Sequence, residues 1–167
     1  MGQIRKVAPD AQRAGADEPV ANAIAFARYA DGTFGWNIND PGHGLVLASA
    51  DRPLDAAAAA PLSASGSWGP LLISDDATAV PPQLRGYLLD LKPGYEDDPT
   101  RAVYNHAWLI GDASALDVSF QAQVDELVAL APIRSGSGAA HLAPPPGAAE
   151  PERGADSGGQ SQGAQDR

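Results

Sequence analysis

Residues 44–74, GLVLASADRPLDAAAAAPLSASGSWGPLLIS, decide the fold of this chain. Two continuous apolar runs, at residues 45–47 and 71–73, show no alternation of apolar and polar side chains. Each run therefore predicts a strand buried on both faces, as in a parallel sheet covered by helices. The segment between them, residues 54–64, is too rich in alanine for a strand and long enough for a helix that crosses back over the sheet. The stretch predicts a β-α-β unit.

The flanking sequence extends this unit. Apolar residues spaced i, i+3, i+4 and i+7 predict amphipathic helices over residues 19–29 and 82–91, and an apolar stripe predicts a last helix over residues 118–131. A third strand is expected over residues 102–110. The element order α-β-α-β-α-β-α predicts a small α/β/α sandwich of three layers, flavodoxin-like or Rossmann-like, with a mainly parallel three-stranded sheet. Right-handed crossovers favour the strand order 2-1-3 or 3-2-1.

The length of 167 residues suits one domain with a tail. From residue 132 onward the sequence is rich in Pro, Gly and Ser and has almost no apolar side chain larger than alanine. Such a segment buries too little surface to offset an ordering cost of roughly 1–2 kcal/mol per residue. We therefore expect a flexible N-terminal segment at residues 1–18, the α/β module at residues 19–131 and a disordered tail at residues 132–167.

The net charge of −10 lies mostly in the expected module, because residues 19–131 hold fourteen acidic and five basic side chains. This balance argues against nucleic acid or an anionic membrane as a partner. The chain has no cysteine, which excludes disulfides and thiolate metal sites. No apolar run reaches the ~20 residues of a membrane span, and no signal-peptide core follows the N-terminal charges. The chain is therefore cytoplasmic, part of a longer exported protein, or has its start upstream of Met1.

Two motifs in the opening stretch resemble a known family. The segment at residues 55–60, DAAAAA, precedes a second motif formed by Pro70, Leu71, Leu72 and Ile73. This pattern resembles the cell wall-binding repeat 2 family, whose modules have an Asp-Ala-Leu-Ala segment and then a Pro-Ile-Leu-Leu motif. Residues 107–127 resemble the third strand and closing helix of that family. Gly111 matches the first glycine of the family's Val-Ile-Gly-Gly turn, and Asp112 replaces the second.

The resemblance implies a non-catalytic module of the bacterial envelope that binds a cell-wall glycan or secondary polymer, often with three modules packed together. The acidic module would repel an anionic polymer at long range. A neutral polysaccharide, a bridging divalent cation such as Ca²⁺, or a local basic patch is then required. Arg52 and Arg85 are candidates for that patch, unless they are solvated or paired with aspartates. The alternative function is a structural module that packs with like modules through exposed sheet edges.

Polar residues follow each predicted strand, and ligands of open α/β sheets collect at the carboxyl ends of the strands. We therefore select as candidate polymer-binding residues Arg52, Asp55, Ser74 and Asp112. The acidic residues Asp51, Asp75 and Asp112 leave open a third hypothesis, a metal-dependent phosphoryl or receiver-like enzyme. Helix caps and turns explain the same residues. No nucleophile elbow, phosphate loop or zinc-binding pair is present, so we assign no catalytic residue.

Aromatic residues give two further expectations. Phe34 and Trp36 lie in a loop with glycines, where their rings either stack on sugars or close one end of a small core. Trp68 and Trp108 are expected in core or turn packing. The polar pair at residues 105–106 interrupts the third strand, which predicts a bulge or a polar pair facing the sheet edge.

Overall fold

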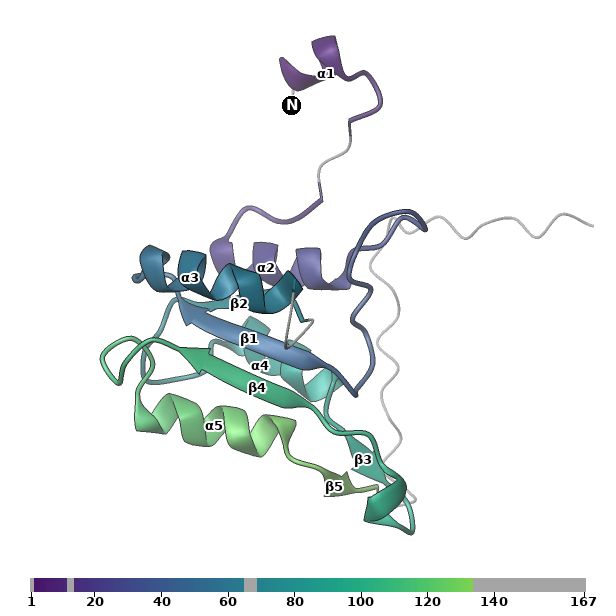
Figure 1. The fold of residues 1–167 in the computed structure, drawn as a ribbon, viewed down its shortest axis with the longest axis vertical. Helices are drawn as coiled ribbons and strands as arrows, with labels where there is room; N and C mark the ends of the chain where they lie inside the picture. The colour runs from purple at the N-terminus through teal and green to yellow at the C-terminus, as the bar shows by residue number, and fades with distance from the viewer. Residues whose placement is uncertain (1, 12–13, 65–68, 134–167) are drawn as a thin grey trace, which may run out of the picture. The chain divides into compact units, whose positions relative to one another are not determined.

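The computed structural model describes residues 2–11, 14–64 and 69–133. The chain divides into two units, Met1–Ser135 and Gly136–Arg167, and the described residues all belong to the first. Its helices are α1 (Ile4–Val7), α2 (Pro19–Arg28), α3 (Pro53–Ala64), α4 (Pro82–Asp90), the 3₁₀ helix η1 (Pro99–Arg101) and α5 (Val118–Val128) (Figure 1). Its strands are β1 (Gly44–Ser49), β2 (Leu71–Ser74), β3 (Gly94–Tyr95), β4 (His106–Ile110) and β5 (Ala131–Pro132). Trp68 and the expected tail beyond residue 133 lie outside the described residues.

The three longer strands form a parallel sheet in the order β2-β1-β4. This confirms the predicted α/β fold and the 2-1-3 order, with the first predicted strand in the centre. Residues 45–48 of β1 are fully buried, because the strand has a neighbour on each side and side chains packed on each face. In β2 the burial alternates, with Leu72 fully buried and both Leu71 and Ile73 half-buried. The prediction of burial on both faces therefore holds for β1 and only in part for β2.

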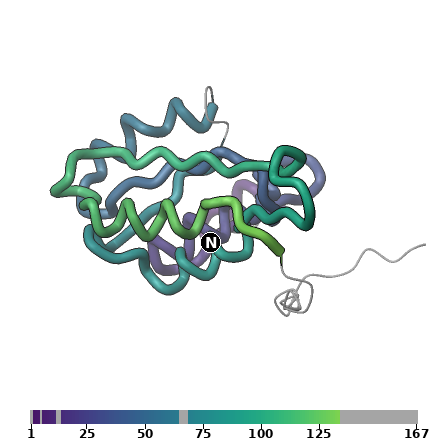
Figure 2. The backbone as a smooth tube through the Cα atoms, turned by 90° about the horizontal axis from the view of Figure 1, so that it is seen from below, coloured from purple at the N-terminus to yellow at the C-terminus, as the bar shows by residue number. Residues whose placement is uncertain are grey.

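Helices cover the two faces of the sheet unequally. On one face, a single hydrophobic core joins alternate residues of β1 and β2, among them Leu45, Leu47 and Leu72, to side chains of α2, α4 and α5. On the other face, α3 lies against β1 and β2. Figure 2 shows α3 on one side of the strands and α5 on the other. The three expected layers are present, but one outer layer consists of a single alanine-rich helix.

The third strand is shorter than predicted. It begins at His106 rather than at residue 102, and the 3₁₀ helix η1 precedes it. Its register with β1 runs without interruption from His106, opposite Gly44, to Ile110, opposite Ala48. A bulge at residues 105–106 is therefore wrong, because the polar pair marks the start of the strand instead.

The last helix also ends earlier than predicted. It stops at Val128, and Ala131 and Pro132 form β5, which pairs in parallel with β3. Pro132 has no amide hydrogen and disfavours a helical conformation of the residue before it. Ile133 N then donates a hydrogen bond to Tyr95 O (2.8 Å), which extends the contact between the two short strands.

Candidate functional site

The carboxyl ends of β1 and β4 lie side by side, because these strands are parallel neighbours. From β1 the chain continues into α3 on one face of the sheet, and from β4 it continues into α5 on the other face. The connections diverge here, which makes this position a topological switch point. In open α/β sheets, ligands bind in the crevice outside such a point.

Three of the four predicted polymer-binding residues meet at this position. Arg52 Nε lies 3.3 Å from Asp55 Oδ2, and Arg52 Nη1 lies 3.8 Å from Asp112 Oδ1. Arg52 Nη1 also donates a hydrogen bond to Ser114 Oγ (3.2 Å). The guanidinium is therefore paired with aspartates, the alternative that the sequence left open, and its charge is balanced locally. We call Arg52, Asp55, Asp112 and Ser114 the switch-point cluster.

Ser74, the fourth predicted residue, is fully buried at the end of β2. Its hydroxyl donates a hydrogen bond to Asp76 O (2.7 Å) and accepts one from Asp76 N (3.3 Å), so it serves the turn that follows the strand. Arg85 is exposed on α4, which covers the face of the sheet opposite α3. Pro70 and Leu72 of the family-like motif are fully buried, as expected for core residues.

The carboxylate of Asp112 is held in its charged form. The hydroxyl of Ser114 donates to Asp112 Oδ1 (2.6 Å), and the Ser114 amide donates to the same oxygen (2.9 Å). These bonds, with a smaller contribution from the charge of Arg52, lower the pKa of Asp112 below its ordinary value.

Within residues 2–11, 14–64 and 69–133, no group of three or more His, Cys, Asp or Glu side chains is placed to hold a metal ion. Asp51 and Asp75 are exposed where β1 and β2 end.

The lowered pKa of Asp112 predicts how stability depends on pH. The pKa of Asp112 in the folded chain lies below its unfolded value of about 3.9. The hydrogen bonds that the charged Asp112 carboxylate accepts therefore stabilise the folded state above that pH. The contribution is lost as the pH falls through the folded pKa. We expect the difference in free energy of unfolding between the chain and Asp112→Asn to be constant above about pH 5 and to shrink below about pH 4. Urea denaturation across this range measures it, and a difference that does not vary with pH would contradict the assignment.

One face of β4 is exposed. Ala107 and Leu109 pack against the core, whereas His106 is exposed and Trp108 is 39% exposed on the opposite side of the strand. The expectation that Trp108 packs in the core is therefore wrong. The reason is the position of α3, which lies mainly against the central strand β1, touches the edge strands β2 and β4 much less, and offers mostly short alanine side chains.

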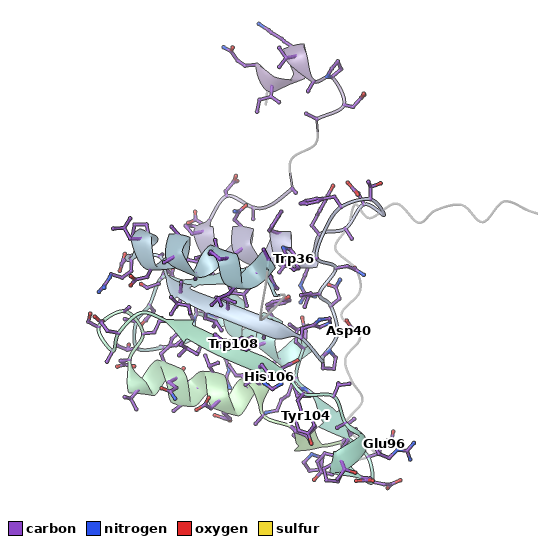
Figure 3. The ribbon with its side chains drawn as sticks, viewed as in Figure 1. Trp36, Asp40, Glu96, Tyr104, His106 and Trp108 are labelled. Atoms are coloured by element: carbon purple, nitrogen blue, oxygen red, sulfur yellow. The ribbon has the colours of Figure 1, made fainter. Side chains whose placement is uncertain are left out.

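Three aromatic side chains follow this exposed face. His106 and Trp108 are alternate residues of β4 and share one side of the strand, and Tyr104, two residues before His106, is exposed as well (Figure 3). The ring centroids of His106 and Trp108 are 5.9 Å apart. Tyr104 is 49% exposed, and its hydroxyl donates a hydrogen bond to Pro99 O (2.9 Å). We call Tyr104, His106 and Trp108 the aromatic strip.

The buried side chain of Asn105 fixes the backbone of the aromatic strip. Its Oδ1 accepts hydrogen bonds from Gly42 N (2.8 Å) and His43 N (3.2 Å), and its Nδ2 donates to Leu91 O (2.7 Å). The amide of His106 donates to His43 O (3.0 Å). The predicted polar pair therefore separates into a buried anchor and an exposed ring.

The two loop aromatics differ in exposure, and only Trp36 takes the core position that the sequence offered as one alternative. Trp36 is half-buried and packs against the core. Phe34 is 61% exposed, and its ring centroid lies 6.1 Å from that of Phe26 and 6.5 Å from that of Tyr29. Trp36 therefore closes part of the core, whereas Phe34 belongs to a separate exposed aromatic group.

The sequence analysis missed the aromatic strip, although the sequence carries a signal for it. The alternation of Tyr104, His106 and Trp108 with Asn105 and Ala107 has the period of two that is typical of a strand with one exposed face. This alternation places Trp108 on the side of the strand opposite Ala107 and Leu109, which face the core.

None of the helices in the described part of the chain combines the length and the apolar character needed to cross a bilayer. No protein-family model matches the chain, and no curated protein or solved structure matches it significantly.

Proposed function

We propose that this chain is a non-catalytic module that binds a glycan polymer of the cell envelope. The observation that carries the proposal is the switch-point cluster, in which Arg52, Asp112 and Ser114 present polar groups at the carboxyl ends of two parallel strands. The motifs at Asp55 and at residues 70–73 add support, because they resemble those of the cell wall-binding repeat 2 family.

The cluster suits the hydroxyl groups of a sugar. Arg52 offers several N–H donors and its side chain is 42% exposed, while Asp112 offers carboxylate acceptors and its side chain is 66% exposed. A sugar hydroxyl both donates and accepts, so it can bind an arginine and a carboxylate at once. Arg52 is already balanced by two aspartates, Asp55 and Asp112. The cluster therefore favours uncharged hydroxyls over phosphate or carboxylate groups, in agreement with the acidic charge of residues 19–131.

A pull-down assay tests the proposal. We expect the chain to sediment with isolated actinobacterial cell walls and to bind glycan purified from them, with or without Ca²⁺. Arg52→Ala should weaken binding by about tenfold, since it removes a charged hydrogen-bond donor from the site. The matched control is Arg85→Ala, which removes an exposed arginine on the opposite face and should leave binding unchanged.

Two outcomes would count against this function. If the chain stays in the supernatant with every wall preparation, both with and without Ca²⁺, it is not an envelope-binding module. If Arg85→Ala weakens binding as much as Arg52→Ala, overall charge rather than the switch-point cluster governs the interaction.

A structural or assembly module remains a second candidate, favoured by the edges of the sheet. In the order β2-β1-β4, the outer edges of β2 and β4 pair with no other strand among the described residues. Unpaired edges invite contact with another chain. Sedimentation over a wide concentration range tests this function, and a monomer at every concentration would argue against it.

A further inference from the structure

We propose that the aromatic strip, Tyr104, His106 and Trp108, is a stacking platform for the sugar rings of an uncharged glycan chain. The inference rests on the proposed function and assigns to it a second contact surface and a class of polymer. The switch-point cluster would bind hydroxyl groups at the carboxyl ends of the strands. The aromatic strip would bind the apolar faces of sugar rings along β4.

The exposure of the strip is a departure from the usual construction of a parallel sheet. Parallel sheets are normally covered on both faces, and their strands are continuously apolar. Here α3 lies mainly against β1 and covers β4 only sparsely, so Trp108 is 39% exposed, whereas the face of β4 that bears Leu109 packs against the core. Exposed groups of apolar side chains on a soluble domain commonly mark an interaction site. The strip is therefore a candidate contact surface rather than an unfinished core.

The rings are held in place before any ligand arrives. Tyr104 is tied at its hydroxyl to Pro99 O, and the ring of His106 lies against that of Trp108. Asn105, buried between Tyr104 and His106, fixes the backbone through three hydrogen bonds. A surface ordered in advance loses little conformational entropy on binding. This arrangement suits a flat, weakly bound ligand that gains affinity from repeated contacts along a polymer.

The charges around the strip favour an uncharged sugar. Asp40 Oδ1 lies 3.3 Å from the ring of His43, the residue whose carbonyl accepts the amide of His106. Glu96 lies beyond the Tyr104 end of the strip in Figure 3 and is exposed. Acidic side chains accept hydrogen bonds from sugar hydroxyls, and a domain with an excess of them repels phosphate or uronate groups. A pyranose has C–H groups on its faces and hydroxyls at its rim, which matches this arrangement.

The same charges disfavour a second copy of this chain as the occupant. Two modules that each carry fourteen acidic and five basic side chains between residues 19 and 131 repel one another at long range. The strip also consists of aromatic rings that each carry a polar group: the hydroxyl of Tyr104, the ring nitrogens of His106 and the indole N–H of Trp108. Such rings have an apolar body and a polar edge, a composition suited to a ligand that is itself partly polar.

The experiment measures wall binding of the full chain and of five variants, with soluble polymers as competitors. The uncharged competitors are mannan and an oligomer of N-acetylglucosamine, and the anionic ones are polyglycerol phosphate and polygalacturonate. We expect Trp108→Ala to weaken wall binding by about tenfold or more, as for an aromatic residue central to an interface, and Tyr104→Ala to weaken it less. Trp108→Phe retains a ring and should restore most of the binding. The matched control, Leu89→Ala, removes an exposed apolar side chain from α4, on the opposite face of the sheet, and should have no effect.

Each outcome separates this inference from the proposed function. If the unaltered chain binds neither walls nor any soluble polymer, both fail. If the unaltered chain binds walls and Trp108→Ala binds equally well, the aromatic strip is not the platform, while the proposed function stands. Competition by the anionic polymers alone, or a change of oligomeric state in Trp108→Ala, would also overturn the inference. Thermal unfolding of each variant shows whether the fold is intact, and His106→Ala provides a second test if Trp108→Ala does not fold.

Discussion

Replacing Gly69 with alanine is expected to destabilise the fold by about 3 kcal/mol or more, because the added methyl group would press against backbone atoms that cannot move freely. Gly69 is buried immediately before β2, and a methyl group there would overlap the carbonyl group of Gly44 at the start of β1. Relieving this overlap requires the two strands to separate where Val46 N donates a hydrogen bond to Pro70 O (3.3 Å). Urea denaturation of the purified chain measures the effect.

A matched control for this substitution lies in α4. Gly86 has no atom within 4 Å of the position that a methyl group would occupy, and it lies inside the helix. Gly86→Ala should therefore stabilise the chain by about 0.5–1 kcal/mol, since alanine has the higher helix propensity. The two substitutions are chemically identical and have opposite expected signs. Equal effects at both positions would show that the close contact between Gly69 and Gly44 does not limit the fold.

Replacing Asn105 with alanine is expected to cost about 3 kcal/mol, because it leaves several buried backbone groups without partners. The amides of Gly42 and His43 lose their acceptor, and the carbonyl of Leu91 loses its donor. Urea denaturation measures the loss of stability. Hydrogen exchange at the Gly42 and His43 amides gives a local readout, and we expect both to lose protection.

The control for Asn105→Ala is Asn39→Ala, which removes an exposed asparagine whose bonds join only side chains. We expect it to change stability by no more than about 0.5 kcal/mol, as is usual for surface substitutions. Because Asn105 also fixes the backbone between Tyr104 and His106, Asn105→Ala should weaken wall binding even under conditions where the variant remains folded. Unchanged stability and unchanged amide protection would contradict the role of Asn105 as the anchor of β4.

The fold was largely predictable because its central strand is encoded locally. The apolar run at residues 45–47 lies at the centre of β1, Gly44–Ser49, since a strand buried on both faces carries consecutive apolar side chains. β4 was less predictable. Its apolar residues indicate a strand, but its start depends on Asn105, whose partners lie at residues 42–43 and at Leu91. Contacts so far apart in the sequence leave no local pattern.

The candidate sites show the same division. The rule that ligands collect at the carboxyl ends of parallel strands was enough to select Arg52, Asp55 and Asp112, and the structure brings them together. Ser74 satisfied the same rule, yet it is buried, because the turn after β2 folds back onto its hydroxyl. The rule predicts where along a strand a polar residue lies and does not predict whether its side chain faces solvent.

The sequence alone determined the β-α-β unit of residues 44–74 and the α/β class, and it narrowed the strand order to two possibilities, because these follow from apolar periodicity and from the handedness of crossovers. The tertiary structure selected the order β2-β1-β4. Only the tertiary structure decided which face of each strand is covered. The exposure of Trp108 depends on α3 lying mainly against β1 and only sparsely against β4, a matter of long-range packing that no window of sequence contains. The aromatic strip is therefore a consequence of where one alanine-rich helix lies on the sheet.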